Sequence, residues 1–200
     1  MIKLDREGAL DMIERFPFMP AVIWSGEHGA YWREHGWTRS RDEAERHTIA
    51  KAVRLTLNCR PEKKISFVLV DFLQLDFALP PSTNQLFVEA AGKKKGSGRQ
   101  RVKTAEYKAW IELAGLNLKT QLSEAKIRIG DDPLFAENFG LWIRLDINHQ
   151  GDITNRIKAL EDFLVAAHVT TGDQWNDRAL VERDREIPTP CRVVIYREVQ

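Results

Sequence analysis

The sequence predicts an α+β fold in which helices pack on a mixed β-sheet. Residues 139–148 place an apolar side chain at every second position, which is the period of a half-buried strand. Residues 107–118 place apolar side chains at i, i+3, i+4, i+7 and i+11, which together form one buried face of a helix. Strands and helices otherwise mix along the chain without strict βαβ alternation, which favours α+β over α/β.

The composition is that of an ordinary soluble protein. The 200 residues are 43% hydrophobic and 30% charged, and a chain of this length forms one large domain or a medium domain with a small one. No apolar run approaches the ~20 residues of a membrane-spanning helix. Four acidic residues between Met1 and Arg15 argue against a signal peptide, so we expect a cytoplasmic protein with no membrane partner.

The cysteines and histidines predict no zinc site and no disulfide framework. Cys59 and Cys191 are the two cysteines, and they lie far apart in the sequence, so we expect free buried thiols. The five histidines show no spacing typical of zinc ligands.

Residues 1–70 predict a small accessory domain, β-rich with one or two helices. Residues 5–15 and 41–57 have helical spacing, residues 22–24 and 30–33 predict a hairpin, and residues 65–70 predict a strand. The expected buried stripe of the second helix is Ala44, Ile49, Ala52, Val53 and Leu57.

Three tryptophans in this part of the chain, Trp24, Trp32 and Trp37, allow two interpretations. A domain this small needs large side chains to bury enough area, which favours a place in its core. The alternative is an exposed platform on which nucleic-acid bases stack.

Residues 71–200 predict a second, larger domain. Its first strand, residues 72–79, is stopped by Pro80 and Pro81, and Thr104 is a good N-cap for the helix that follows. The remaining predicted elements are strands at 125–129 and 139–148, a helix at 155–167 and a closing strand at 192–196.

A basic, glycine-rich loop precedes the helix that begins after Thr104. The net charge of the chain is only +1, yet seven basic residues and one acid lie between Lys93 and Lys108. Such a loop attracts phosphates by releasing counterions, although a solvated surface loop would look the same. The candidate DNA-binding residues are Lys93, Lys94, Lys95, Arg99, Arg101 and Lys103.

The candidate catalytic residues lie around the predicted helix 155–167. Its apolar residues share one face, whereas Asn155, Lys158 and Asp162 share a different one. Asp152 precedes the helix, and the chain is long enough to bring Asp173 back toward the helix start. Two carboxylates meeting there would suit Mg²⁺ or Mn²⁺, which prefer oxygen ligands and support phosphodiester hydrolysis.

These residue types also have ordinary structural roles. Asp152 or Thr154 could be the N-cap of the helix. Lys158 and Asp162 could form a solvated helix face, and Asp173 could be a turn residue next to Gly172.

Three segments resemble the RusA family of phage and bacterial Holliday-junction resolvases. Residues 152–162 followed by 172–174 resemble the family's D-x-D-N-x-x-K-x-x-x-D … D-D signature. Residues 79–84 resemble its opening strand that ends in P-P-S-x-N, and residues 102–110 resemble its first helix. The matching order and spacing cover the chain from about residue 72 to residue 200.

The resemblance implies a homodimeric, magnesium-dependent endonuclease that nicks four-way DNA junctions during recombination and repair. Carried over by position, Asp152 and Asp173 would be metal ligands, Lys158 the functional lysine and Asn155 the asparagine at the helix start. Thr154 departs from the family, which usually has a second aspartate there, and Asp146 is a candidate replacement ligand.

Two other functions stay open at this point. Gly172 also departs from the family, which often has an acid at that position. The first alternative is a branched-DNA-binding protein that keeps the fold and the basic loop but is left without chemistry by Thr154. The chain could also be a phage protein-interaction module without a DNA role. Residues 31–33, 36–38 and 62–65 resemble small uncharacterised phage modules, a resemblance that implies no activity.

Overall fold

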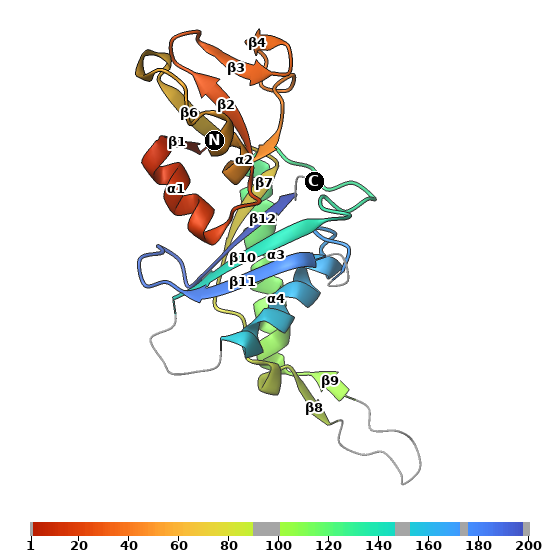
Figure 1. Ribbon diagram of the computed structural model, residues 1–200. Helices are drawn as coiled ribbons and strands as arrows, with labels where there is room; N and C mark the ends of the chain where they lie inside the picture. The colour runs from red at the N-terminus through yellow and green to blue at the C-terminus, as the bar shows by residue number, and fades with distance from the viewer. Residues whose placement is uncertain (1, 90–100, 147–152, 173–175, 198–200) are drawn as a thin grey trace. The chain divides into compact units, whose positions relative to one another are not determined.

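The computed structural model describes residues 2–89, 101–146, 153–172 and 176–197. Helix and strand occur in nearly equal shares, about 32% and 31% of the chain, which confirms the predicted α+β class. The chain divides into two compact units (Figure 1). The first ends at Leu73 and also takes the end of the last strand from Tyr196, and the second is Gln74–Ile195.

The first unit is built on an antiparallel sheet with the strand order β1-β6-β2-β3-β4, and β5 pairs with β2. The strands are β1 (Lys3–Leu4), β2 (Pro20–Ser25), β3 (Ala30–Arg33), β4 (Gly36–Thr38), β5 (His47–Thr48) and β6 (Ile65–Leu69). The helical elements are α1 (Arg6–Arg15), α2 (Ile49–Leu55) and the 3₁₀ turn η1 (Pro61–Lys63). The predicted hairpin is confirmed as β2 and β3.

The predicted helix over residues 41–57 is wrong at its start. His47 and Thr48 pair with β2, and Thr48 then accepts a hydrogen bond from the Lys51 N–H, so the helix begins only at Ile49. Its stripe is shorter for the same reason, because Ala44 lies in a turn before the helix. Leu57 lies beyond the helix and is 57% exposed.

One of the three tryptophans packs on a buried cluster of the first unit. Trp24 lies against the buried cluster of Val22, Ala44, Val68 and Val70. Trp32 and Trp37 are half-buried and pair edge to face across β3 and β4, with centroids 5.4 Å apart. Their pairing across the two strands stabilises the β3–β4 hairpin.

The second unit is built on a four-stranded sheet with the order β11-β10-β12-β7. The strands are β7 (Phe72–Phe77), β10 (Phe139–Leu145), β11 (Asn176–Arg183) and β12 (Cys191–Arg197). β10 and β11 are parallel, and α4 (Thr154–Ala166) lies between them in sequence. Parallel neighbours need such a crossover connection, so β10-α4-β11 is a βαβ unit.

The long helix α3 (Ala105–Glu124) covers the open edge of this sheet. Thr104 caps it as predicted, accepting the Tyr107 N–H. The Gln121 side chain donates to the Asp76 carbonyl and accepts the Asp76 N–H, at 2.8 and 2.7 Å. Trp110 donates to the Ala78 carbonyl. β7 is the edge strand, so these bonds occupy backbone groups that another strand could otherwise pair with.

An aromatic cluster joins α3 and α4 to the sheet. Phe163 of α4 contacts Phe77 of β7 and Trp110 of α3, with ring centroids 5.6 and 5.5 Å apart. Leu160 and Leu164, on the same side of α4, are fully buried. The apolar face predicted for this helix is therefore confirmed and fixes its orientation.

The predicted strand at 125–129 is wrong. α3 continues to Glu124, and Lys126 adopts a left-handed conformation with φ 57°. Lys126 N–H donates to Ser123 O and Ile127 N–H to Leu122 O, the two bonds of a Schellman helix end. The alternation of apolar residues after Ala125 thus lies in a helix end and a loop.

The remaining elements are short. The 3₁₀ turn η2 (Thr83–Gln85) follows the two prolines, and β8 (Phe87–Glu89) pairs with β9 (Arg101–Lys103) as a hairpin. β11 was not anticipated from the sequence, whereas the closing strand is confirmed as β12. Within the described parts of the chain, no helix is long and apolar enough to cross a membrane.

Candidate functional site

The polar face of α4 carries the predicted lysine and its neighbour one turn later. Lys158 Nζ lies 3.0 Å from Asp162 Oδ1, and their side chains are 50% and 40% exposed. Since the opposite face of α4 is buried, this pair is held at the surface of the second unit. The lysine is therefore accessible to a ligand and loosely neutralised.

The start of α4 lies against the segment that follows β7. Thr83 Oγ1 donates to Asn155 Oδ1 at 3.1 Å, and the Arg156 guanidinium donates to the Pro80 carbonyl. Ser82 and Gln85 form a reciprocal capping box that fixes this segment as a turn. Two of the three segments that carry the family resemblance are thus in direct contact.

The structure assigns Ile153 as the N-cap of α4, and among the described residues no side-chain cap hydrogen bond is formed there. Asp152 and the side chain of Thr154 lie outside the described residues, so the alternative that one of them caps the helix stays open. The first turn of a helix has backbone N–H groups without helical partners and carries a partial positive charge. An anionic group such as a phosphate is favoured at that end.

A groove of about 420 Å³ runs between β8, β9, α3 and α4. We call it the α3–α4 groove. Its polar lining includes Lys103, Tyr107, Lys158, Asp162 and the backbone at Gly172. It brings together residues from separate parts of the sequence, and the sequence analysis had already named Lys103, Lys158, Asp162 and Gly172.

Tyr107 is the residue in this groove that the sequence analysis assigned only to the core. Burial raises the pKa of its hydroxyl, and the Asp162 carboxylate raises it further, so it stays protonated at neutral pH. The Lys103 ammonium lies 5.3 Å from the centre of its ring. Helical spacing signalled that Tyr107 faces inward but not that it borders a groove.

Asp146 follows β10 directly and is partly buried. Its N–H donates to the Pro190 carbonyl, while no hydrogen bond or ion pair engages its carboxylate among the described residues. A carboxylate in that state can act as a ligand for a hard cation. Asp146 is not part of a metal-binding cluster there, because no group of three or more histidine, cysteine or acidic residues able to hold a metal occurs in the described ranges.

The neighbouring carboxylates belong to an ion-pair cluster that the sequence analysis missed. Arg144 of β10 contacts Glu182 of β11 at 3.6 Å and pairs with Asp184 just beyond that strand. The parallel register of β10 and β11 places these side chains at one edge. Without a prediction of β11, the sequence carried no signal for this cluster.

Several predicted site residues lie outside the described residues. They are Asp152, Asp173, Lys93, Lys94, Lys95 and Arg99. For Arg101 the backbone is described in β9 but the side chain is not, and the same holds for Thr154 in α4. The meeting of Asp152 and Asp173 therefore stays a prediction.

No family model matches the chain, and no curated protein matches it. Its resemblance to the RusA resolvases therefore rests on the residues quoted above.

Proposed function

We propose that the second unit is a metal-dependent endodeoxyribonuclease that nicks four-way or other branched DNA in phage or bacterial recombination and repair. The contact between Thr83 and Asn155 carries this proposal, since they come from separate segments that resemble RusA resolvases. The proposal also takes the protein to be cytoplasmic and to form a homodimer. The homodimer is expected because a two-fold symmetric junction suits a two-fold symmetric enzyme.

The residues have distinct roles in this proposal. Asp152 and Asp173 would hold Mg²⁺ or Mn²⁺, with Asp146 as a replacement for the missing aspartate at Thr154. A divalent ion in such a site activates water and stabilises charge on the phosphate. Lys158, exposed at the edge of the α3–α4 groove, would neutralise the developing charge on the scissile phosphate.

Asn155 positions the start of α4 through its bond to Thr83. The basic residues Lys93, Lys94, Lys95, Arg99, Arg101 and Lys103 would contact the DNA backbone.

Cleavage of a labelled four-way junction tests the proposal, with a linear duplex of the same sequence as the matched substrate. We expect metal-dependent nicking of the junction with Mg²⁺ or Mn²⁺ and none with EDTA. Asp152→Asn should abolish nicking while junction binding survives. Absence of junction nicking and binding under every metal condition would refute the proposal.

Thr154 favours one alternative, a branched-DNA-binding protein that has lost its chemistry. A metal site with one carboxylate fewer binds its cation more weakly. Tight junction binding without nicking, together with nicking gained by Thr154→Asp, would support this alternative. Weak binding to every DNA, unaffected by salt, would instead favour a protein-interaction module.

A further inference from the structure

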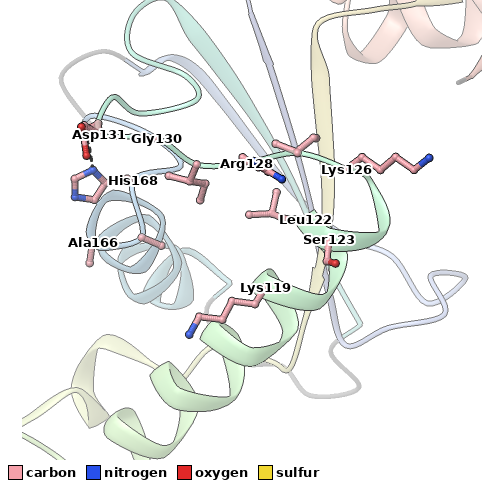
Figure 2. Close-up of a pocket in the computed structure, with 12 residues that line it drawn as sticks. Lys119, Leu122, Ser123, Lys126, Arg128, Gly130, Asp131, Ala166 and His168 are labelled. Carbon is pink, nitrogen blue, oxygen red and sulfur yellow. Dashed lines mark hydrogen bonds between the residues drawn. The ribbon is translucent and has the colours of Figure 1, made fainter.

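A second and larger cavity lies where α3 and α4 end (Figure 2). Its volume is about 1100 Å³. Lys119 and Leu122 come from α3, Arg128 from the loop after that helix, and His168 from the end of α4. Ala166 lines both this cavity and the α3–α4 groove, so the two hollows adjoin along α4.

The charge of this cavity is positive and largely uncompensated. Lys119, Lys126 and Arg128 are exposed, and within the described ranges no ion pair joins any of them to a carboxylate. Asp131 is the sole acidic residue among those that line the cavity, and its carbonyl oxygen lies 3.3 Å from His168 Nδ1. Figure 2 shows Lys119 extending from α3 on the side of α4, while Lys126 points away from the cavity at its rim.

The ends of the two helices do not need these cations. α4 ends like α3, because His168 has φ 56° and donates its N–H to Val165 O, while Val169 N–H donates to Leu164 O. Both ends are Schellman motifs, in which backbone N–H groups satisfy the last carbonyls. Cations at helix ends often serve this purpose, so Lys119 and Arg128 are left available for an external anion.

We propose that this cavity binds the phosphate backbone of one duplex arm of a DNA junction whose branch point lies at the α3–α4 groove. The inference rests on the proposed function and extends it to a surface outside the basic loop. Lys119 follows Tyr107 by twelve residues, which is about 18 Å along a helix. One DNA strand carries a phosphate about every 3.4 Å of axis, so a duplex arm spans that distance in about five phosphates.

The floor of the cavity fits this occupant. Leu122 is buried and Ile127 and Ile129 are half-buried, so the cations border an apolar surface. Sugar rings can pack on such a surface. Because that packing excludes water, it lowers the local dielectric constant and strengthens the attraction between cation and phosphate.

The double variant Lys119→Gln/Arg128→Gln tests the inference by fluorescence anisotropy with a catalytically silent background, Asp152→Asn. We expect the Kd for a four-way junction to rise on the order of tenfold or more at 0.1 M salt. The plot of the logarithm of the association constant against the logarithm of the salt concentration should become shallower by about 2, since two phosphate contacts are lost at about 0.9 each. Lys126→Gln should change both quantities less, because its side chain points away from the cavity.

Lys51→Gln/Arg54→Gln is the matched control. It removes the same charge from exposed positions on α2 in the first unit. The control should keep the wild-type slope if the effect is local. An equal change in both variants would mean that the effect depends only on the net charge of the protein, and it would overturn the inference.

The outcomes separate the inference from the proposed function. If the wild-type enzyme binds and nicks junctions and the Lys119/Arg128 variant binds them with unchanged Kd and slope, the cavity inference is overturned and the proposed function stands. If the parent protein binds no DNA, both are overturned. Circular dichroism and thermal melting verify that the variants fold. Arg128→Glu alone provides a second measurement, because reversing one charge should weaken junction binding more than neutralising the same charge.

Discussion

Replacing Lys158 by methionine separates a role in chemistry from a role in stability. Lys158 pairs with Asp162 one helical turn later, and half of its side chain is exposed. Exposed ion pairs of this spacing contribute about 0.3–0.5 kcal/mol. Methionine keeps a similar unbranched stem and helix propensity. For a chain of this size, 1 kcal/mol corresponds to about 2–4 °C, so the melting temperature should fall by only about 1–2 °C.

Under the proposed function, the effect of Lys158→Met on nicking should be far larger than its effect on stability. Groups that neutralise charge in a transition state typically contribute 10²–10³-fold to the rate. We therefore expect the single-turnover nicking rate of Lys158→Met at saturating enzyme to fall by about 100-fold or more. Junction affinity should fall less than about tenfold, as for the loss of one phosphate contact.

Two variants complete this experiment. Asp162→Asn removes the same ion pair and should match Lys158→Met in melting temperature, and Lys51→Met removes an exposed helical lysine from the first unit. Lys51→Met should nick at the wild-type rate. A Lys158→Met enzyme that nicks within threefold of wild type at saturation would refute the assignment of this lysine to chemistry.

Three further predictions concern stability and reactivity. Gln121→Leu removes both hydrogen bonds to the Asp76 backbone and should cost about 1–3 kcal/mol in urea unfolding; a loss below about 0.3 kcal/mol would contradict the role in covering the sheet edge. Burial lowers the pKa of His47 below its usual 6.5, so the unfolded chain binds the proton more readily. Stability should therefore be complete above about pH 6.5 and decline as the pH falls toward the folded pKa, and His47→Gln should flatten this decline. Burial raises the pKa of Cys191 to about 12, so a thiol reagent at pH 8 should label Cys59 alone in the native protein and both cysteines in urea.

Local spacing was sufficient to predict several elements. Alternation predicted β10, Thr104 correctly marked the start of α3, and helical spacing separated the buried and polar faces of α4. These properties depend on backbone periodicity and on hydrogen bonds between residues a few positions apart, so the sequence by itself determines them.

Local spacing was misleading where two periods overlap. The apolar residues after Ala125 alternate as in a strand, yet they follow a helix whose end is fixed by Lys126 in the left-handed conformation. The stretch before Ile49 has helical spacing, yet His47 and Thr48 pair with β2. In both places a hydrogen-bonding partner outside the pattern decides the structure.

The candidate site shows the same division. The sequence determined that Asn155, Lys158 and Asp162 share one helix face, because residues three and four positions apart are neighbours on a helix. Only the tertiary structure decided that Thr83 contacts Asn155, that Tyr107 borders the groove beside Lys158, and that the ends of α3 and α4 enclose a basic cavity. Such contacts join segments dozens of residues apart, and they depend on how buried faces such as that of Phe163 pack against one another, which no local pattern specifies.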